Sequence, residues 1–332
     1  MDWSAKDIPD QRGRVAVVTG ANSGIGFVAA RELARRGARV LLACRRGQRG
    51  VAALARLRAE VPGAEAEYRR LDLADLASVR SFAERYDHDR LDLLINNAGV
   101  MAVPYAKTAD GFETQFGVNH LGHFALTGLL SPRLLATPGA RVISVSSSMH
   151  AAADVDFFNL NGELRYRRWS AYGSSKSANL LFIHELAHRF AAAGADTVAA
   201  AAHPGFAATG LQTAGARIQG RRTAERALRL LTRILAQSAE AGALPILYAA
   251  TAPGVAPDSF TGPRLAGLAR RARAVQTGRA DPRRPHQRSA LGDLATAHRR
   301  SVQGAVANRA GAPAPAPDDD RSPSTRSNLE SA

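Results

Sequence analysis

RVAVVTGANSGIG, residues 14–26, joins a short apolar run to a glycine-rich turn. The run Arg14–Thr19 is rich in β-branched residues and ends at a glycine, which predicts a strand buried on both faces. Apolar residues then recur at helical spacing over Phe27–Arg36, so the turn Gly20–Gly26 lies between a strand and a helix. Glycines in that setting let a pyrophosphate approach the backbone and the helix N-terminus. The segment predicts a dinucleotide-binding unit rather than a mere tight turn.

The alternation of strand and helix continues along the chain. Further strands are expected at 38–43, 65–71, 91–95, 140–145, 197–202 and 259–263, and further helices at 51–60, 76–86, 112–130, 171–193, 224–237 and 239–250. Regular alternation favours an α/β fold with one doubly wound parallel sheet and helices on both faces. We therefore predict a single domain over residues 10–263. Sheets of this type bind ligands beyond the carboxyl ends of their strands.

Tyr172 and Lys176 lie four residues apart on one of the expected helices, so their side chains share a face. A fixed cation beside a phenol favours the phenolate and lowers its pKa. Lysine is scarce, because Lys6, Lys107 and Lys176 are the three lysines among 44 basic residues. The pair predicts a general acid or base, and the alternative is an ordinary amphipathic helix face.

Five motifs follow expected strand ends or lie on the next helix. They are Thr19-Gly20-x-x-x-Gly24-x-Gly26, Asn96-Asn97-Ala98-Gly99, Ser146-Ser147, Tyr172-x-x-x-Lys176 and Pro204-Gly205. The set resembles the short-chain dehydrogenase/reductase family over residues 10–263, which implies a Rossmann-type fold. Within that family, Ser147–His150, the acidic insertion between 149 and 168, and Ala171–Asn179 resemble the retinol dehydrogenase and protochlorophyllide reductase branch. That branch implies an apolar carbonyl or alcohol as the substrate.

The resemblance also implies roles for four residues. Tyr172 would donate or accept the proton at the substrate oxygen, and Lys176 would lower its pKa and bind the nicotinamide ribose. Ser147 would polarise the substrate oxygen, since it occupies the matching position after the fifth strand, and the adjacent Ser146 and Ser148 could be confused with it. Asn119 would hold a water molecule in a proton relay. The alternative for Asn119 is a polar residue that kinks a helix.

The end of the second strand decides which cofactor is expected. Ala43-Cys44-Arg45-Arg46 has no acidic residue for a ribose 2′-hydroxyl, whereas a guanidinium can bind a 2′-phosphate through two parallel hydrogen bonds. We predict NADP(H), with Arg45 as the main contact and Arg46 as a second; the alternative is a solvated arginine pair. The full cofactor-binding set implied by the resemblance is Gly20, Ser23, Gly24, Ile25, Gly26, Arg45, Arg46, Asp72, Leu73, Asn97, Ala98, Gly99, Lys176, Pro204, Gly205 and Thr209.

Composition limits the other classes of protein. The single cysteine, Cys44, excludes an intrachain disulfide framework. No apolar run approaches the roughly 18 to 20 residues of a membrane span, and the start of the chain lacks the apolar core of a signal peptide. We expect a cytoplasmic protein. No residues have metal-ligand spacing, and His120, His123 and His203 are expected to be structural.

The C-terminal segment 264–332 carries 13 basic and 6 acidic residues, a large share of the formal net charge of +15. Its arginine-, alanine- and proline-rich composition predicts an irregular, disordered basic tail. A frameshifted translation is the alternative, because out-of-register codons for Ala290–Gln303 can spell the apolar helix usual in this branch. Residues 207–222, with Phe206 and Leu211 as apolar lining, are expected to form a substrate lid.

The function expected is that of an NADP(H)-dependent oxidoreductase acting on an apolar carbonyl or alcohol, with Tyr172 as the general acid or base. The family implies a homodimer or homotetramer. A nucleotide-binding sensor or scaffold without turnover is one alternative. A nucleic-acid binder that uses the arginine-rich tail is another, and the position of the charge in the tail argues against it.

Overall fold

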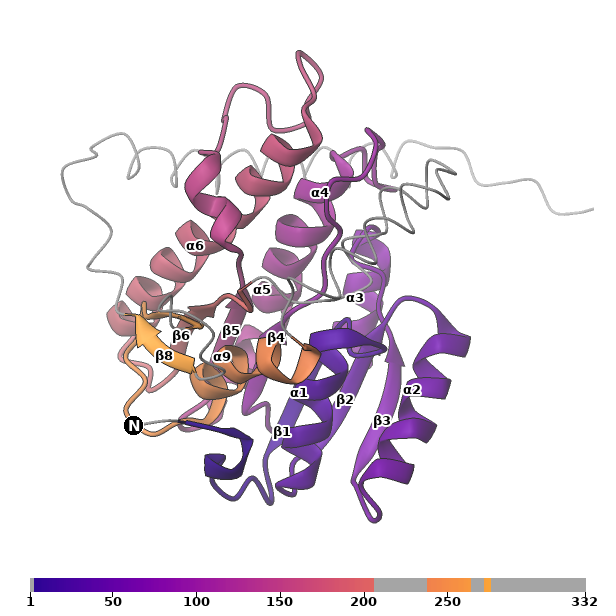
Figure 1. Ribbon diagram of the computed structural model, residues 1–332, viewed down its shortest axis with the longest axis vertical. Helices are drawn as coiled ribbons and strands as arrows, with labels where there is room; N and C mark the ends of the chain where they lie inside the picture. The colour runs from indigo at the N-terminus through magenta and orange to yellow at the C-terminus, as the bar shows by residue number, and fades with distance from the viewer. Residues whose placement is uncertain (1–2, 206–237, 264–271, 276–332) are drawn as a thin grey trace, which may run out of the picture. The chain divides into compact units, whose positions relative to one another are not determined.

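The computed structural model describes residues 3–205, 238–263 and 272–275, all within the unit Met1–Leu291. One sheet contains seven parallel strands in the order β3-β2-β1-β4-β5-β6-β7 (Figure 1). The strands are β1 (Val15–Thr19), β2 (Arg39–Cys44), β3 (Ala66–Arg70), β4 (Leu93–Asn96), β5 (Arg141–Val145), β6 (Val198–Ala202) and β7 (Phe260–Pro263). The strand order reverses between β1 and β4, which confirms the predicted doubly wound sheet. The domain boundary at residue 263 stays a prediction.

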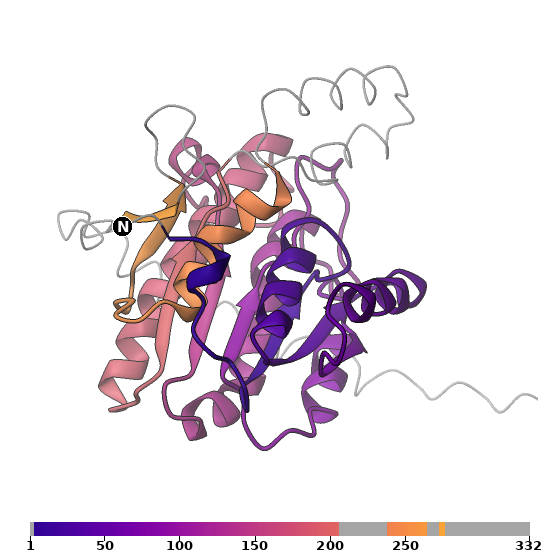
Figure 2. The ribbon, with the colours of Figure 1, turned by 60° about the horizontal axis from the view of Figure 1, so that its bottom comes forward.

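Helices cover both faces of the sheet. The helices are α1 (Gly24–Arg35), α2 (Gly47–Glu60), α3 (Leu76–Glu84), α4 (Thr114–Phe116), α5 (Gly122–Ala136), α6 (Arg168–Ala192) and α9 (Ala239–Thr251), with short turns η1 (Ala5–Asp7), η2 (Gly117–Leu121) and η3 (Ser148–Ala152). One apolar core lies under α1, α2 and α9, and the other lies under α3, α5 and α6. Figure 2 shows α1 and α9 side by side on their face of the sheet. Within the described ranges, no helix is long and apolar enough to cross a bilayer.

The structure differs from the sequence-based expectation at two places. The single helix expected at 112–130 is interrupted by the π-helical turn η2, in which the Gly122 amide bonds five residues back to the Gly117 carbonyl. A short strand, β8 (Ala272–Val275), pairs antiparallel with β7 inside the segment expected to be irregular. The helix expected at 224–237, the lid at 207–222 with Phe206 and Leu211, and the rest of the tail lie outside the described residues.

Asp92 joins the two central strands just before β4 begins. Its side chain is 1% exposed, and its Oδ2 accepts hydrogen bonds from the Val15 amide at 2.9 Å and from Arg90 Nε at 2.8 Å. Burial opposes ionisation of this carboxyl group, but the bonds from Arg90 and Val15 outweigh burial and lower its pKa. The carboxylate therefore stabilises the junction of β1 and β4 in its ionised form.

We expect Asp92→Asn to lower the free energy of unfolding by about 2 to 3 kcal/mol at neutral pH, because it removes charge-assisted bonds to a buried acceptor. The pKa is lower in the folded state, so this stabilisation is present above the ordinary carboxyl pKa. It is lost as pH falls through the folded-state pKa. Urea unfolding at several pH values measures it. The control is Glu65→Gln, in an exposed pair with Arg39, which we expect to lose less than about 1 kcal/mol; equal losses would contradict the argument.

Candidate active site

The glycine-rich turn is shaped by close contacts with the end of β4. Gly20 and Gly24 have φ angles of +68° and +55°, in the region that favours glycine. A Cβ on Gly20 would lie 2.9 Å from Ala98 Cα, and a Cβ on Gly26 would collide with Asn97 Nδ2 and lie 2.7 Å from the Gly20 carbonyl oxygen. The missing side chains therefore leave a cradle of bare backbone next to Asn97 and Ala98.

This cradle fits the pyrophosphate of a dinucleotide. Ser23 immediately precedes α1, yet its hydroxyl makes no capping hydrogen bond to the first turn of that helix. The amides of Gly24, Ile25 and Gly26 in that turn lie at the positive end of the helix, which favours an anion. The residues present are thus suited to the predicted cofactor at this end of the sheet.

The remaining predicted cofactor residues follow other strand ends. Arg45 and Arg46 come directly after β2 and are exposed, and Asp72 and Leu73 follow β3. Pro204 and Gly205 follow β6, where Gly205 has a φ angle of +66°. Thr209 lies outside the described residues. The carboxyl ends of β1, β2, β3, β4 and β6 lie on one edge of the parallel sheet, so the fold places these residues along that edge.

Tyr172 lies near the start of α6, with 5% of its surface exposed, and it is close enough to Ser147 for that side chain to act to lower the pKa of its hydroxyl group. Ser147 begins the turn η3 after β5, where its Oγ also accepts a bond from the Met149 amide at 3.3 Å. Ser146 instead donates its hydroxyl to the Lys176 carbonyl oxygen at 2.8 Å. The two serines therefore have different partners, and Ser147 is the one that influences the pKa of the phenol.

Lys176 is 4% exposed, and its Nζ donates a hydrogen bond to the Val145 carbonyl oxygen at 2.9 Å. Its Nζ lies 5.7 Å from the centroid of the Tyr172 ring, so the pair does share a helix face. Burial lowers the pKa of Lys176 to about 8.

The pKa of Tyr172 in the folded protein is set chiefly by burial, and the expectation that Lys176 lowers it stays a prediction. Burial raises the pKa of Tyr172, and the Ser147 side chain opposes that rise only in part. The phenol is desolvated, and the ammonium group lies 5.7 Å from the centroid of the ring and bonds to a main-chain carbonyl. The phenol therefore keeps its proton at neutral pH in this arrangement.

Asn119 lies in the π-helical turn η2 and is completely buried. Its Oδ1 accepts a bond from the Val100 amide at 2.7 Å, and its Nδ2 donates to the Val100 carbonyl oxygen at 2.9 Å and to Ser175 Oγ at 3.0 Å. A Cβ on Gly99 would lie 3.0 Å from Asn119 Oδ1 and 3.7 Å from Lys176 Nζ. Asn119 and Lys176 thus flank Gly99, and the role of Asn119 in holding a relay water stays a prediction.

Two residues of this network are absent from the predicted set. Thr19 Oγ1 accepts bonds from the amides of Asn97 and Ala98, each at 2.9 Å, and so joins the end of β1 to the end of β4. Ser175 donates its hydroxyl to the Tyr172 carbonyl oxygen at 2.7 Å while it accepts from Asn119. Both residues belong to motifs that the sequence singles out, but nothing in the pattern indicates which of their atoms bond.

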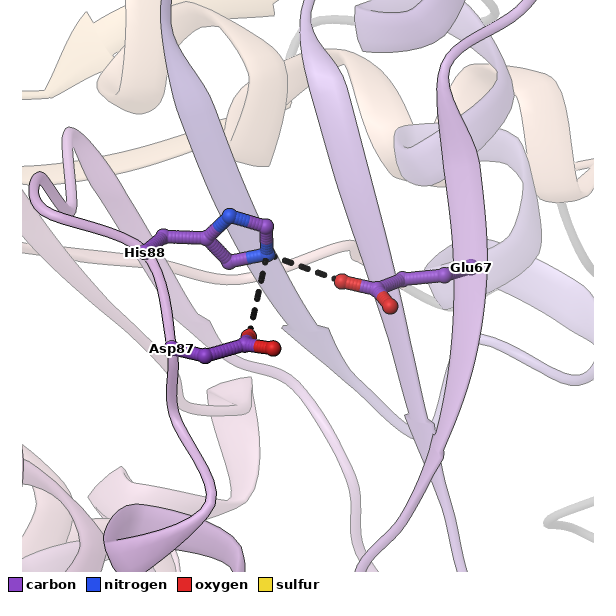
Figure 3. Close-up of side chains that lie close together, drawn as sticks. All are labelled: Glu67, Asp87 and His88. Atoms are coloured by element: carbon purple, nitrogen blue, oxygen red, sulfur yellow. Dashed lines mark hydrogen bonds and ion pairs between the residues drawn. The ribbon is translucent and has the colours of Figure 1, made fainter.

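A second group of titratable residues lies away from this site, at the edge strand β3 (Figure 3). His88 Nε2 is 2.8 Å from Glu67 Oε1 and 3.8 Å from Asp87 Oδ1. Burial opposes ionisation of Glu67, but hydrogen bonds from His88 and Arg69 lower its pKa. Arg69 also pairs with Asp87 at 2.7 Å, so a guanidinium group already supplies positive charge to both carboxylates. We assign this cluster to an ion-pair network at the sheet edge.

The one cavity described beside these elements has a volume of about 380 Å³ and lies between β3 and α3. Arg69, Ser78 and Tyr86 are among its lining residues. Neither Tyr172 nor Ser147 lines it. The position of Tyr172 relative to Ser147 and Lys176, and not this cavity, therefore locates the candidate chemistry.

Comparisons with known proteins agree with this arrangement. A family model described as short chain dehydrogenase matches residues 14–217. Retinol dehydrogenase 12 of Mus musculus is 53% identical over 195 residues, which cover 58% of this chain and 61% of that protein. Retinol dehydrogenase 13 of Homo sapiens is 43% identical over 267 residues, covering 80% of this chain and 79% of that protein. The crystal structure of an uncharacterized protein from Mycobacterium paratuberculosis is 44% identical, with a TM-score of 0.68, covering 83% of this chain and 89% of that chain. The match to the mouse protein spans less than two thirds of its length.

Proposed function

Because the chain belongs to the short-chain dehydrogenase family and to its retinol dehydrogenase-like branch, we propose that it is an NADP(H)-dependent oxidoreductase that interconverts an alcohol and a carbonyl compound. The observation that carries the proposal is the buried Tyr172 phenol, which the Ser147 side chain influences, with the Lys176 ammonium group 5.7 Å from the centroid of its ring. This set lies at the same sheet edge as the glycine cradle.

In the proposed chemistry, Tyr172 donates or accepts the proton, and Ser147 and Tyr172 together bind the substrate oxygen. A bound nicotinamide supplies or accepts the hydride. Burial keeps the phenol protonated, so Tyr172 is ready to donate its proton to the oxygen of a carbonyl being reduced. Lys176, which is mostly charged below about pH 8, then stabilises the phenolate that is left. Ser147 donates a hydrogen bond to the developing alkoxide.

We propose an apolar alcohol or its carbonyl partner as the substrate. The support is that the relatives with 53% and 43% identity are named as retinol dehydrogenases. The test measures loss of NADPH absorbance against a panel of apolar aldehydes and ketones, including a retinoid aldehyde, with Tyr172→Phe as the control. Equal rates in the two proteins would exclude the mechanism. NADPH binding without turnover of any substrate would favour a sensor.

The preference for NADPH is expected to depend on the two arginines after β2. Replacing both, Arg45→Ala and Arg46→Ala, should raise the KM for NADPH about 10- to 100-fold, because charge-assisted bonds to a 2′-phosphate are lost. The KM for NADH should stay nearly unchanged, since NADH lacks that phosphate. Steady-state kinetics with both cofactors measures the ratio. Arg49→Ala, an exposed arginine on α2, is the matched control; a similar change for NADPH and NADH would contradict the assignment.

A further inference from the structure

His123 lies in the first turn of α5 and is 2% exposed, and both nitrogens of its ring have partners. Its Nε2 lies 2.9 Å from Thr19 Oγ1, and its Nδ1 lies 3.0 Å from the main-chain oxygen of Asn119. Thr19 is the last residue of β1, next to the glycine cradle, and Asn119 lies in the turn η2 beside Lys176. The imidazole therefore bridges the cofactor end of β1 and the turn that carries Asn119.

The partners of Thr19 fix the direction of each hydrogen bond. The Thr19 hydroxyl already accepts from the amides of Asn97 and Ala98, so both of its lone pairs are used. Its one proton can be donated, and His123 Nε2 at 2.9 Å is closer than the Ile95 carbonyl oxygen at 3.3 Å. At the other side of the ring, the Asn119 carbonyl oxygen can only accept. His123 Nδ1 must therefore carry the ring proton.

The charge of the ring agrees with this arrangement. Burial lowers the pKa of His123 to about 3, so the imidazole is neutral at neutral pH. A second proton on Nε2 would face the proton of the Thr19 hydroxyl, whose other nearby acceptor, the Ile95 carbonyl oxygen, is more distant at 3.3 Å. One tautomer of the neutral ring thus satisfies both contacts.

The contact between His123 and Asn119 lies within the turn η2. π-helical bonding displaces the carbonyl partners of a helix by one residue. The ring of His123 supplies a donor to the Asn119 carbonyl inside this turn, while the Asn119 side chain is held by Val100 and Ser175. Main chain and side chain of Asn119 are therefore both fixed, and the His123 ring ties them to β1.

We propose that His123 is a positioning residue, which as a neutral Nδ1–H imidazole sets the distance between the cofactor-binding end of β1 and Asn119. It contacts no reacting atom. Its effect on turnover rests on the proposed function, since the position of Asn119 matters to catalysis only if proton transfer passes along this side of Tyr172 and Lys176.

The first test needs no turnover. In protein labelled with ¹⁵N-histidine, nitrogen chemical shifts should show one neutral Nδ1–H ring that does not titrate between about pH 8 and about pH 5, where an unperturbed histidine would. That signal should disappear in His123→Asn. An Nε2–H tautomer, or titration near the ordinary histidine pKa, would overturn the proposal. Because this measurement is independent of substrate, an inactive enzyme would count against the proposed function alone.

The second test separates positioning from packing. His123→Phe keeps a ring of similar volume and loses both bonds, so kcat should fall about 10- to 100-fold with little change in the KM for the carbonyl substrate, as expected when reacting groups are displaced. His123→Asn retains an amide N–H near the position of Nδ1, and it should recover part of kcat.

Leu126→Ala is the control for a general loss of stability. Leu126 lies one turn further along α5, is completely buried, and contacts the apolar core rather than the hydrogen-bond chain. Its midpoint of thermal unfolding should fall while kcat at 25 °C is retained. Two outcomes would show that the role of His123 is packing and that the proposal is wrong. In the first, His123→Asn has no higher kcat than His123→Phe. In the second, both variants have the same kcat as Leu126→Ala. The NMR test still decides if His123→Phe does not fold.

Discussion

Replacing Tyr172 with phenylalanine is expected to lower kcat by about 10²- to 10⁴-fold, the range for loss of a general acid. The phenol is 5% exposed and burial raises its pKa, so no solvent group can easily take its place. Phenylalanine keeps the ring next to Lys176 and removes one oxygen. The NADPH dissociation constant should therefore stay close to that of the parent protein.

The measurement pairs single-turnover kinetics with a fluorescence titration of NADPH. Tyr86→Phe is the matched control, because Tyr86 is 6% exposed and its hydroxyl bonds to the Arg90 carbonyl oxygen, far from Ser147. It should lose some stability and keep its kcat. A Tyr172→Phe protein with a kcat within threefold of the control would show that the proton comes from another group.

Replacing Lys176 with methionine should lower kcat by at least about 10²-fold. At neutral pH, the same replacement should make the folded protein more stable. Burial lowers the pKa of Lys176 from 10.5 to about 8, so the unfolded chain binds this proton more tightly than the folded protein does. Below pH 8, keeping the Lys176 ammonium group charged in the folded protein lowers the free energy of unfolding by about 3 kcal/mol. The bond to the Val145 carbonyl, about 1 kcal/mol, is lost in the variant. The net gain expected is about 2 kcal/mol.

The sign of the pH dependence tests this reasoning. For the parent protein, the contribution of Lys176 to stability becomes less unfavourable as pH rises from about 8 to 10.5, because the folded protein releases the proton first. The difference between Lys176→Met and the parent should therefore shrink over that range. Carbonyl reduction by the parent should decline above about pH 8, as the ammonium charge is lost. Lower stability of Lys176→Met at pH 7 would contradict the assumed burial of a charged amine.

The fold was predictable because it depends on patterns within single segments. The apolar run before Gly20 forms β1, and the helical periodicity after it forms α1, although α1 begins at Gly24 rather than Phe27. The π-helical turn was not predictable, since it depends on Asn119 bonding to Val100 and Ser175, which lie 19 and 56 residues away in the chain. β8 escaped prediction for a related reason: its definition is its backbone pairing with β7, and its sequence has no strand pattern.

The site was predictable in its composition and less so in its contacts. Motif spacing correctly placed Tyr172 and Lys176 on one helix face, but it could not show that the ammonium group bonds to the Val145 carbonyl. Position in the motif selected Ser147 from the run of serines after β5, but it left Ser146 and Ser148 open to confusion with it, because the direction of each side chain depends on α6. His123 was expected to be structural, and its partners became visible only when β1 and α5 were seen together.

The small space between Gly26 and the Gly20 carbonyl oxygen determines which mutations at position 26 can be compensated elsewhere in the chain. A Cβ at position 26 would collide with the side-chain amide of Asn97, and a shorter residue at position 97 would relieve that collision. The same Cβ would also collide with the main-chain oxygen of Gly20, and no substitution can remove a main-chain atom. Arg45 and Arg46 after β2 are exposed. Random mutagenesis should therefore yield second-site suppressors for changes at these two arginines. Position 26 should yield none, and its codon would be the least tolerant in the turn.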